Sequence, residues 1–509
     1  MKRSSVLLLT VVVFLVVSLG AAAQGTLTIA QGTDPSSLDS HVPTDSPAFT
    51  VIEHIVDTLF DLTPDGNIVP LLVDSYEVSE DGTLWQLHIR QGVEFHDGTA
   101  LNAEAVKFNL ERVLDPDFGA TFRFLINTIV EIEVTDEYTV TLRTEVPFAP
   151  LLAHLTHSSL GIQSPTAIAE YGDDYGNEIS VGTGPFRFES WQKGQTVTLV
   201  RNETYWGEQP AYDRLVFRAV PEAGARMMMV QSGDVDVAVR VPPHDVPRLE
   251  ADPEINIVST PSLRTIYMGF NVTMEPFDNP LVRQAVNYAV DVETIIEFIL
   301  GGVGRASDAP VAPAIFGYQP IYDYAYNPDR AQELLAEAGL PDGFSTKIYS
   351  PSGRYMQDIQ VAEAIQAMLS DVGIDAEIVT LEWNTYLETT NRPSEQSEAP
   401  MFLLGWGTVT GDADYGLYAL FHSSQHAPAG SNRTFWGHER VDELLDMART
   451  TPDDQLRIEA YEEAMTLIMQ EAPWLFLHVE SQLTAVRSNV AGLIVHPAER
   501  IIAAGVTFE

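Results

Sequence analysis

Residues 181–207, VGTGPFRFESWQKGQTVTLVRNETYWG, constrain the fold of this chain more than any other segment. Apolar and polar side chains alternate on both sides of Lys193-Gly194, and a Tyr-Trp-Gly corner closes the segment. Alternation with a period of two places the apolar side chains on one face of an extended chain. The segment therefore predicts two strands joined in a hairpin at Lys193-Gly194.

The first residues have the pattern of a secretory signal. Lys2 and Arg3 precede an apolar run over 6–19, and three alanines follow at 21–23. The run is shorter than the roughly 20 residues that a membrane-spanning helix needs. We therefore predict a cleaved signal peptide over 1–23. Because the chain has no cysteine that a lipid could modify, we expect a free periplasmic protein without a lipid anchor.

Length and charge limit the classes of partner. After the signal, roughly 485 residues remain, which is more than one hydrophobic core usually holds, so two or more lobes are expected. The 72 acidic and 28 basic residues give a formal net charge of −44. A chain this acidic is not expected to bind nucleic acid or an anionic membrane.

Strand and helix patterns alternate along the chain, which predicts an α/β fold. The helix expected over 102–115 begins at Asn102, a good N-cap, and Val106, Leu110 and Val113 form its apolar face. Further helices are expected at 48–60, 222–232, 280–291, 328–338, 355–371, 440–450 and 453–471. Strands are expected at 26–31, 84–90, 138–146, 234–240, 266–272, 346–350, 375–381, 401–406 and 474–486.

Several of these segments resemble motifs of one family. RNETYWG matches an "RNxxYWG" pattern, residues 95–112 match "FHDGxxxxAxxVxxxxxR", and Phe270-Asn271 and DNPLVRQAVNYAVD follow in the same order. The chain thus resembles the family 5 extracytoplasmic solute-binding proteins, the peptide, nickel and oligosaccharide receptors of ABC importers. The resemblance covers essentially the whole mature chain.

The resemblance implies a type II periplasmic binding protein fold with a cluster C-like extra subdomain. Lobe one is expected to span 24–270, with an inserted subdomain at about 66–180. Lobe two is expected over 271–476, and 477–509 would return to lobe one. Crossover strands near 270 and 477 would act as the hinge.

Motifs for catalysis and metal binding are weak. The chain contains no GxSxG, HExxH, GxxxxGK[ST] or paired CxxC motif. His154 with His157, and His422 with His426, have spacings at which two rings could share a metal. We nevertheless expect no metal, no cofactor and no catalytic residue.

The segment GWGTVTGDADYGL at 405–417 resembles the family's "GWxxDxxDPxxxL" segment. There, the resemblance implies, the Trp borders the bound peptide and the Asp three positions later pairs with the α-ammonium. Trp406 is retained, but Val409 replaces the acid, and a buried ammonium needs an anion. Asp412, Asp414 or Asp45 would have to supply it. The sequence TGDAD in this segment more closely resembles the glutathione-type branch of the family.

Each candidate ligand contact has an alternative structural role. Asp412 and Asp414 could cap a helix, and Trp406 could belong to the core. Arg354, in the loop PSGRY, is the candidate fork for a ligand carboxylate, with Arg392 as a second option. Trp383 is interpreted as core. The remaining candidates, from the family's cleft edge, the crossover and the 405–417 segment, are Thr44, Asp45, Ser46, Asn271, Thr408, Val409 and Thr410.

The resulting hypothesis is the periplasmic receptor of an ABC importer, acting as a monomer. It would capture a short peptide or a glutathione-like ligand between its lobes and deliver it to a membrane permease. An oligosaccharide is the alternative ligand, since Val409 removes the charged anchor. From another class, a secreted hydrolase is the alternative function.

Overall fold

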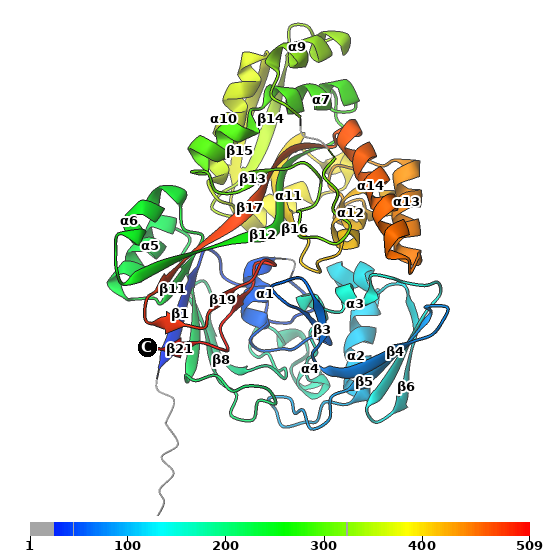
Figure 1. The fold of residues 1–509 in the computed structure, drawn as a ribbon, viewed down its shortest axis with the longest axis vertical. Helices are drawn as coiled ribbons and strands as arrows, with labels where there is room; N and C mark the ends of the chain where they lie inside the picture. The colour runs from blue at the N-terminus through cyan, green and yellow to red at the C-terminus, as the bar shows by residue number, and fades with distance from the viewer. Residues whose placement is uncertain (1–24, 44, 322–323) are drawn as a thin grey trace, which may run out of the picture.

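The computed structural model describes residues 25–43, 45–321 and 324–509. The predicted signal peptide over 1–23 and the candidate Thr44 lie outside these residues. Figure 1 shows two lobes, with the N-terminal part of the chain below and residues from about 270 to 470 above. Two long strands, β12 (Ile255–Phe270) and β17 (Trp474–Arg487), run between them. The predicted two-lobed α/β architecture is confirmed.

One mixed sheet continues through both lobes. Among the described residues it has 11 strands, with β13 (Arg305–Ala306) pairing at the side of β17. The other ten lie in the order β15 (Ile374–Leu381), β14 (Phe344–Pro351), β16 (Met401–Gly407), β12, β17, β11 (Val237–Val239), β1 (Thr26–Gln31), β10 (Arg214–Ala219), β9 (Thr196–Arg201) and β8 (Phe186–Gln192).

Strands β12 and β17 connect the lobes as an antiparallel pair. Toward Ile255, β17 pairs with β11 of lobe one, whereas toward Phe270, β12 pairs with β16 of lobe two. The register of the pair shifts between Pro261 and Thr265. A register shift interrupts the ladder of backbone hydrogen bonds. The irregularity lies in the stretch that joins the lobes, a few residues before 270 and after 477.

The hairpin at 181–207 forms as its alternation predicts. Strands β8 and β9 pair antiparallel, and Gly194 in the turn has φ +73°, a conformation that glycine adopts without steric cost. Strand β9 then pairs with β10, which lies beside β1. The hairpin is therefore one edge of the lobe-one sheet.

A smaller unit of lobe one lies within the range predicted for the inserted subdomain. Its sheet has the order β4 (Val73–Val78), β5 (Leu84–Ile89), β7 (Thr139–Thr144) and β6 (Ile129–Asp136), and helix α2 (Ala103–Leu114) contacts β6 and β7. The predicted N-cap of α2 is present, since the Asn102 side chain accepts a hydrogen bond from the Ala105 N–H at 3.0 Å.

Replacing Asn102 with alanine should lower the free energy of unfolding by about 1 kcal/mol, because the Ala105 N–H loses its acceptor. Asn102→Asp keeps a side-chain oxygen at the same position and should remain close to the wild type. Urea unfolding followed by circular dichroism measures both variants. Equal midpoints for Asn102→Ala and the wild type would show that the cap contributes nothing.

The helix expected over 48–60 is much shorter in the structure. Helix α1 (Ser46–Ile52) ends early, and Phe60 already belongs to β2 (Phe60–Leu62). The reason is tertiary: the carbonyls of His54 and Ile55 accept hydrogen bonds from the N–H groups of Phe186 and Gly184. These bonds draw the chain out of the helical path.

The remaining predicted helices form, with boundaries shifted by a few residues; the helix expected from 355 begins at 358. The other elements of lobe one are β3 (Ile68–Pro70), a short 3-10 helix η1 (Thr121–Leu125), α3 (Leu151–His154), α4 (Pro165–Tyr171), α5 (Ala223–Ser232) and α6 (Val246–Glu250). Lobe two contains α7 (Pro280–Ala289), α8 (Val292–Thr294), α9 (Pro328–Glu337), α10 (Asp358–Asp371), α11 (Trp383–Thr390), α12 (Ala413–Phe421), α13 (Glu439–Thr450) and α14 (Asp454–Glu471).

After β17 the chain lies against lobe one. Its strands there are β18 (Val490–Ala491), β19 (Ile494–Val495), β20 (Ile501–Ile502) and β21 (Thr507–Phe508). The Tyr212 hydroxyl donates to the Ala503 carbonyl at 3.0 Å, and Arg500 forms an ion pair with Asp61 at 2.8 Å. Within the described ranges, no helix has the length and apolar character needed to cross a bilayer.

Candidate ligand-binding cleft

A cavity of about 430 Å³ lies between the two lobes, a volume typical of small-molecule sites. Lobe one lines it with Asp45, Ser46, Phe49, Thr121, Phe122 and His157. From β12, lobe two and the loops after β14 and β16, the lining consists of Arg264, Arg354, Tyr355, Trp383, Leu387, Glu388, Asn391, Leu404, Gly405, Trp406, Gly407, Val409, Tyr415, Pro428, Gly430, Ser431 and Arg433. Both lobes would thus contact an enclosed ligand.

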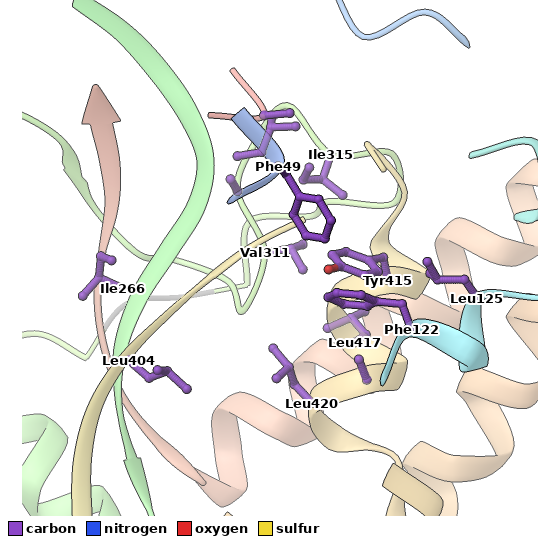
Figure 2. Packing of buried hydrophobic residues seen from close by; sticks show 14 of the residues in the cluster. Phe49, Phe122, Leu125, Ile266, Val311, Ile315, Leu404, Tyr415, Leu417 and Leu420 are labelled. Atoms are coloured by element: carbon purple, nitrogen blue, oxygen red, sulfur yellow. The ribbon is translucent and has the colours of Figure 1, made fainter. Parts of the chain in front are cut away.

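Aromatic rings from both lobes meet at one side of the cavity. Phe49, Phe122 and Tyr415, carried by α1, η1 and α12, all line the cavity, and Figure 2 shows their rings close to one another. His157 forms a hydrogen bond of 3.1 Å with the Tyr415 hydroxyl, and its ring centroid lies 4.6 Å from that of Phe122. Burial lowers the pKa of His157 to about 3, so the imidazole is neutral. This side of the cavity is therefore apolar and uncharged.

Trp406 reaches the cavity because it lies at the end of β16, opposite Thr265 of β12. It is half-buried, and its ring centroid is 5.1 Å from that of Tyr415. The neighbouring Gly405 permits this approach of strands, since a Cβ there would lie 2.5 Å from the Ile266 side chain. The strand end thus presents one indole to the cleft.

Arg354 follows β14 and is 4% exposed. Its guanidinium carbon lies 4.8 Å from the ring centroid of Tyr355 and 5.2 Å from that of Trp383. Within the described part of the chain, its buried Nε and Nη1 atoms have no hydrogen-bond partner. Burial, together with the charge of Arg240, lowers the pKa of Arg354. An anion in the cavity would satisfy both nitrogens.

Two indoles add to this set of free donors. The Nε1 atoms of Trp383 and Trp406 are also buried without a partner among the residues described, and both side chains line the cavity. Buried donors are normally satisfied, so donors left free around one cavity indicate a ligand that supplies acceptors. Carboxylate and carbonyl oxygens would do so.

The acidic side chain from lobe one is Asp45. It caps α1, where its Oδ1 accepts from the Ala48 N–H at 3.2 Å, and its Oδ2 accepts from the Ser36 hydroxyl at 3.4 Å. Burial raises its pKa, although the cap and the charge of Arg354 oppose this. A positively charged group of a ligand would hold the carboxylate in its ionised form.

Arg264 also lines the cavity, but its charge is already paired with a carboxylate of the protein. Its Nε and Nη2 atoms donate to the two carboxylate oxygens of Glu499 at 2.5 and 2.6 Å. It also donates to the Gly405 carbonyl at 2.8 Å and to the Ser46 hydroxyl at 3.0 Å. Arg264 therefore links both lobes and the C-terminal segment, whereas Arg354 forms no ion pair within 4 Å among the residues that the structure describes.

Not every candidate from the sequence lines the cavity. Asp45, Ser46, Arg354, Trp406 and Val409 do so. Thr408 and Thr410 are buried behind the strand end, and Asn271 is fully buried, where its side-chain oxygen accepts from Thr273. Asp412 caps α12 and forms an ion pair of 2.7 Å with Arg457. These contacts are the structural role that was the alternative for Asp412.

Asp414 lies instead in the contact between the lobes. It is completely buried, 3.1 Å from His154 of α3 in lobe one and 3.1 Å from Arg449 of α13 in lobe two. Burial favours the neutral acid, but Arg449 and His154 more than offset it and lower the pKa of Asp414. An N–H group of Ala149 also donates to the Arg449 carbonyl across this contact at 2.9 Å.

In neither histidine pair do the two rings bind the same partner. His154 binds Asp414 and His157 binds Tyr415, whereas His422 lies 3.5 Å from Asp446 and His426 bonds to the Trp436 carbonyl. In the described ranges, no group of three His, Cys, Asp or Glu side chains is arranged to hold a metal ion.

Sequence reasoning missed part of the cavity wall. Trp383, interpreted as core, lines the cavity under Arg354, because it opens α11 rather than lying inside the lobe. Leu387 and Asn391 follow at helical spacing, which is the signal that could have shown this face. Arg433, whose Nη1 donates to the Thr390 hydroxyl at 2.8 Å, carries no local signal of its role. Arg392 lies 3.9 Å from Glu398, away from the cavity.

Two lobes that join at a pair of crossover strands and enclose a polar cavity define a receptor for a small solute. The model of the bacterial extracellular solute-binding proteins, family 5, matches residues 67–428, and the chain belongs to this family. The glutathione-binding protein GsiB of Salmonella typhimurium is 33% identical over 479 residues, 94% of this chain and 93% of the relative. The GsiB of Escherichia coli K12 is 32% identical over 497 residues, 97% and 96% of the two chains.

Solved structures agree with this assignment. The periplasmic binding protein DppA of Helicobacter pylori, in complex with the peptide STSA, has a TM-score of 0.88 and 29% identity over 96% of this chain and 98% of its own. AgaA of A. tumefaciens R10, in complex with agropinic acid, has a TM-score of 0.85 and 28% identity over 95% and 99%. The fold is the two-lobed type II periplasmic binding protein fold, and the family and these relatives are binding proteins associated with ABC transport.

Proposed function

We propose that this protein captures a short peptide or glutathione-like ligand in the cavity between its lobes and delivers it to the permease of an ABC importer. The observation that carries the proposal is the set of buried donors without a partner on Arg354, Trp383 and Trp406, three residues that line one cavity between the lobes. An acceptor-rich ligand with at least one carboxylate is complementary to it.

Binding is coupled to closure in this proposal. Phe49, Phe122 and His157 come from lobe one, whereas Trp406 and Tyr415 come from lobe two, so a ligand contacts both sets only when the lobes are together. A ligand with contacts unique to the closed state shifts the population toward it. A micromolar dissociation constant corresponds to about −8 kcal/mol, which must cover both closure and desolvation.

Several finer features belong to the same proposal. The protein would be exported through cleavage after residue 23, remain free in the periplasm without a lipid anchor, act as a monomer and release its ligand unaltered. The register shift between Pro261 and Thr265 would serve as the hinge. An oligosaccharide is less suited to this cavity, because a neutral sugar would leave Arg354 without an anion.

Isothermal titration calorimetry with reduced glutathione and a panel of di- and tripeptides tests the ligand class, and small-angle scattering of the same samples tests closure. We expect saturable heat with at least one compound and a smaller radius of gyration in its presence. No heat with any compound would contradict the ligand class. Product formation during incubation would instead support the hydrolase.

Trp406→Ala should weaken binding of the best compound by about 2 kcal/mol, or roughly 30-fold, because an aromatic side chain packed in the centre of a site contributes an effect of this size. Trp406→Phe retains an apolar ring and should lose less. Calorimetry measures both. If the two variants bind as tightly as the wild type, Trp406 is a core residue rather than a ligand contact.

A further inference from the structure

We propose that the contact between the lobes binds one proton when the cleft closes, so that low pH favours closure and, with it, the capture of a ligand. The proton is held by His154 of lobe one where it meets Asp414 of lobe two. Neither residue lines the ligand cavity. This inference rests on the proposed function, which requires the lobes to close, and adds a regulation to it.

Both ring nitrogens of His154 face acceptors. Nδ1 lies 2.7 Å from the carbonyl oxygen of Leu125, which can only accept a hydrogen bond. Nε2 lies 3.1 Å from Oδ2 of Asp414, and both side chains are completely buried. A neutral imidazole carries one N–H and satisfies one of these acceptors, whereas the imidazolium carries two. The geometry therefore requires one proton more than a neutral histidine has.

This extra proton belongs to the imidazole and not to the carboxylate. Asp414 also lies 3.1 Å from the Nε of Arg449. Burial would raise the pKa of Asp414, but the charge of Arg449 and the hydrogen bond and charge of His154 lower it overall, so the carboxylate is ionised. An unprotonated Nε2 would then place its lone pair against an anion. A proton on Nε2 turns this repulsion into an ion pair.

His54, another buried histidine of lobe one, shows what happens without a carboxylate. Its Nδ1 faces the Thr50 carbonyl at 2.9 Å, and its Nε2 accepts from the Ala503 N–H at 3.2 Å. One proton therefore satisfies this ring, and burial lowers the pKa of His54 to about 4. His154 differs because an anion from the opposite lobe stands where His54 has an N–H donor.

Opening the cleft removes the need for the second proton. Asp414 and Arg449 lie on α12 and α13 of lobe two, whereas His154 and Leu125 belong to α3 and η1 of lobe one. When the lobes separate, Nε2 faces water, and an imidazole in water loses its second proton near pH 6.5. Above that pH, closure takes a proton from solution and weakens by up to about tenfold per pH unit, the limit for one proton. At lower pH the open form already carries the proton, and the dependence ends.

Other ionisable groups around the contact are Arg457, Asp412, Tyr461, Arg500, Asp61 and His157. The two arginines pair with the two aspartates, and each pair lies within one lobe. The tyrosine and the histidine are neutral, because burial raises the pKa of the first and lowers that of the second. Among the described residues, none of these groups forms an ion pair across the lobes. His154 is therefore the group whose ionic partner depends on closure.

Calorimetry with reduced glutathione on the full mature chain, in phosphate and in Tris buffer at pH 7.5, counts the protons taken up on binding. We expect uptake of about one proton per bound glutathione, and an affinity that falls by about threefold or more from pH 7 to pH 8. Binding without proton uptake would overturn this inference and leave the proposed function intact. Absence of heat would contradict the glutathione-like ligand, and the inference is then decided by a measurement that needs no ligand.

That measurement is single-molecule energy transfer between dyes on the two lobes. Because the chain has no cysteine, Val130→Cys in lobe one and Glu443→Cys in lobe two each attach one dye at an exposed position. The ratio of closed to open molecules should fall by about threefold or more from pH 7 to pH 8. An equal ratio at every pH, including no detectable closed form, would overturn the inference.

Variants assign the proton to this contact. His154→Gln should abolish the proton uptake and the pH dependence, because an amide binds no second proton. Asp414→Asn should do the same, since it removes the anion that retains the proton, and it serves if His154→Gln does not fold. His422→Gln is the matched control: His422 lies 3.5 Å from Asp446 within lobe two, so closure leaves this pair unchanged. Wild-type pH dependence in either His154→Gln or Asp414→Asn would overturn the assignment.

Discussion

Glu499→Gln is expected to lower the free energy of unfolding by about 3 kcal/mol, because it leaves the buried Arg264 without its principal anion. Removing one partner of a buried ion pair typically costs about 3–5 kcal/mol. We expect the lower end, since the Glu480 carboxylate lies 3.9 Å from Arg264 and can take over part of the charge. Urea unfolding measures the loss. Glu463→Gln, which breaks an exposed pair with Arg440, is the matched control and should change little.

The same pair predicts the sign of a pH dependence. Burial alone would raise the pKa of Glu499, but the charge and hydrogen bonds of Arg264 outweigh it and hold that pKa well below the ordinary value. A depressed folded-state pKa contributes stability above the unfolded pKa and loses it as the pH falls. The free energy of unfolding of the wild type should therefore exceed that of Glu499→Gln by the largest amount at neutral pH. This difference should shrink as the pH falls below about 4.5. A difference independent of pH would contradict an ionised Glu499.

Asp414→Asn is expected to weaken binding of the best ligand by at least roughly 30-fold, although Asp414 does not line the cavity. In the structure its carboxylate lies between His154 of lobe one and Arg449 of lobe two, with both lobes in contact. Truncating a buried charge at an interface costs about 2–5 kcal/mol. The loss acts on the closed state, where the lobes bury Arg449, so affinity should fall more than stability does.

Calorimetry and scattering together check this expectation. The variant should have a larger radius of gyration than the wild type at equal ligand concentration. Asp442→Asn is the control, because Asp442 of α13 accepts from the Ser423 N–H and lies 4.0 Å from His422, both within lobe two. An Asp414→Asn variant with wild-type affinity would show that this contact contributes nothing to closure.

The elements that were predictable have local signals. The alternation around Lys193-Gly194 predicts β8 and β9, and Asn102 with its apolar spacing predicts α2, as the structure confirms. The helix over 48–60 was wrong beyond Ile52 because the decisive hydrogen bonds come from 184–186. Such bonds between distant segments leave no periodic pattern near residue 53.

The residues of the candidate site also differ in whether the local sequence indicates their position. Trp406 and Arg354 follow strands whose ends reach the cleft, so their position could be inferred from neighbouring residues. Tyr415, Phe122 and Arg433 could not be inferred in this way, because each reaches the cavity through contacts with residues distant in the sequence, as Arg433 does through Thr390. Their local sequence is equally compatible with a core.

Periodicity and motif order were sufficient for the two-lobed α/β receptor and for its family, since both depend on patterns that repeat within short segments. In contrast, only the tertiary structure decided which of Asp412 and Asp414 has its partner in its own lobe and which has one in the other lobe. Asp412 is the N-cap of α12 and binds Arg457 inside its own lobe, whereas Asp414, two residues later in α12, lies 3.1 Å from His154 of the opposite lobe. The physical reason is that a charge takes its role from the partners that burial brings to it, and here those partners are up to 260 residues away in the sequence.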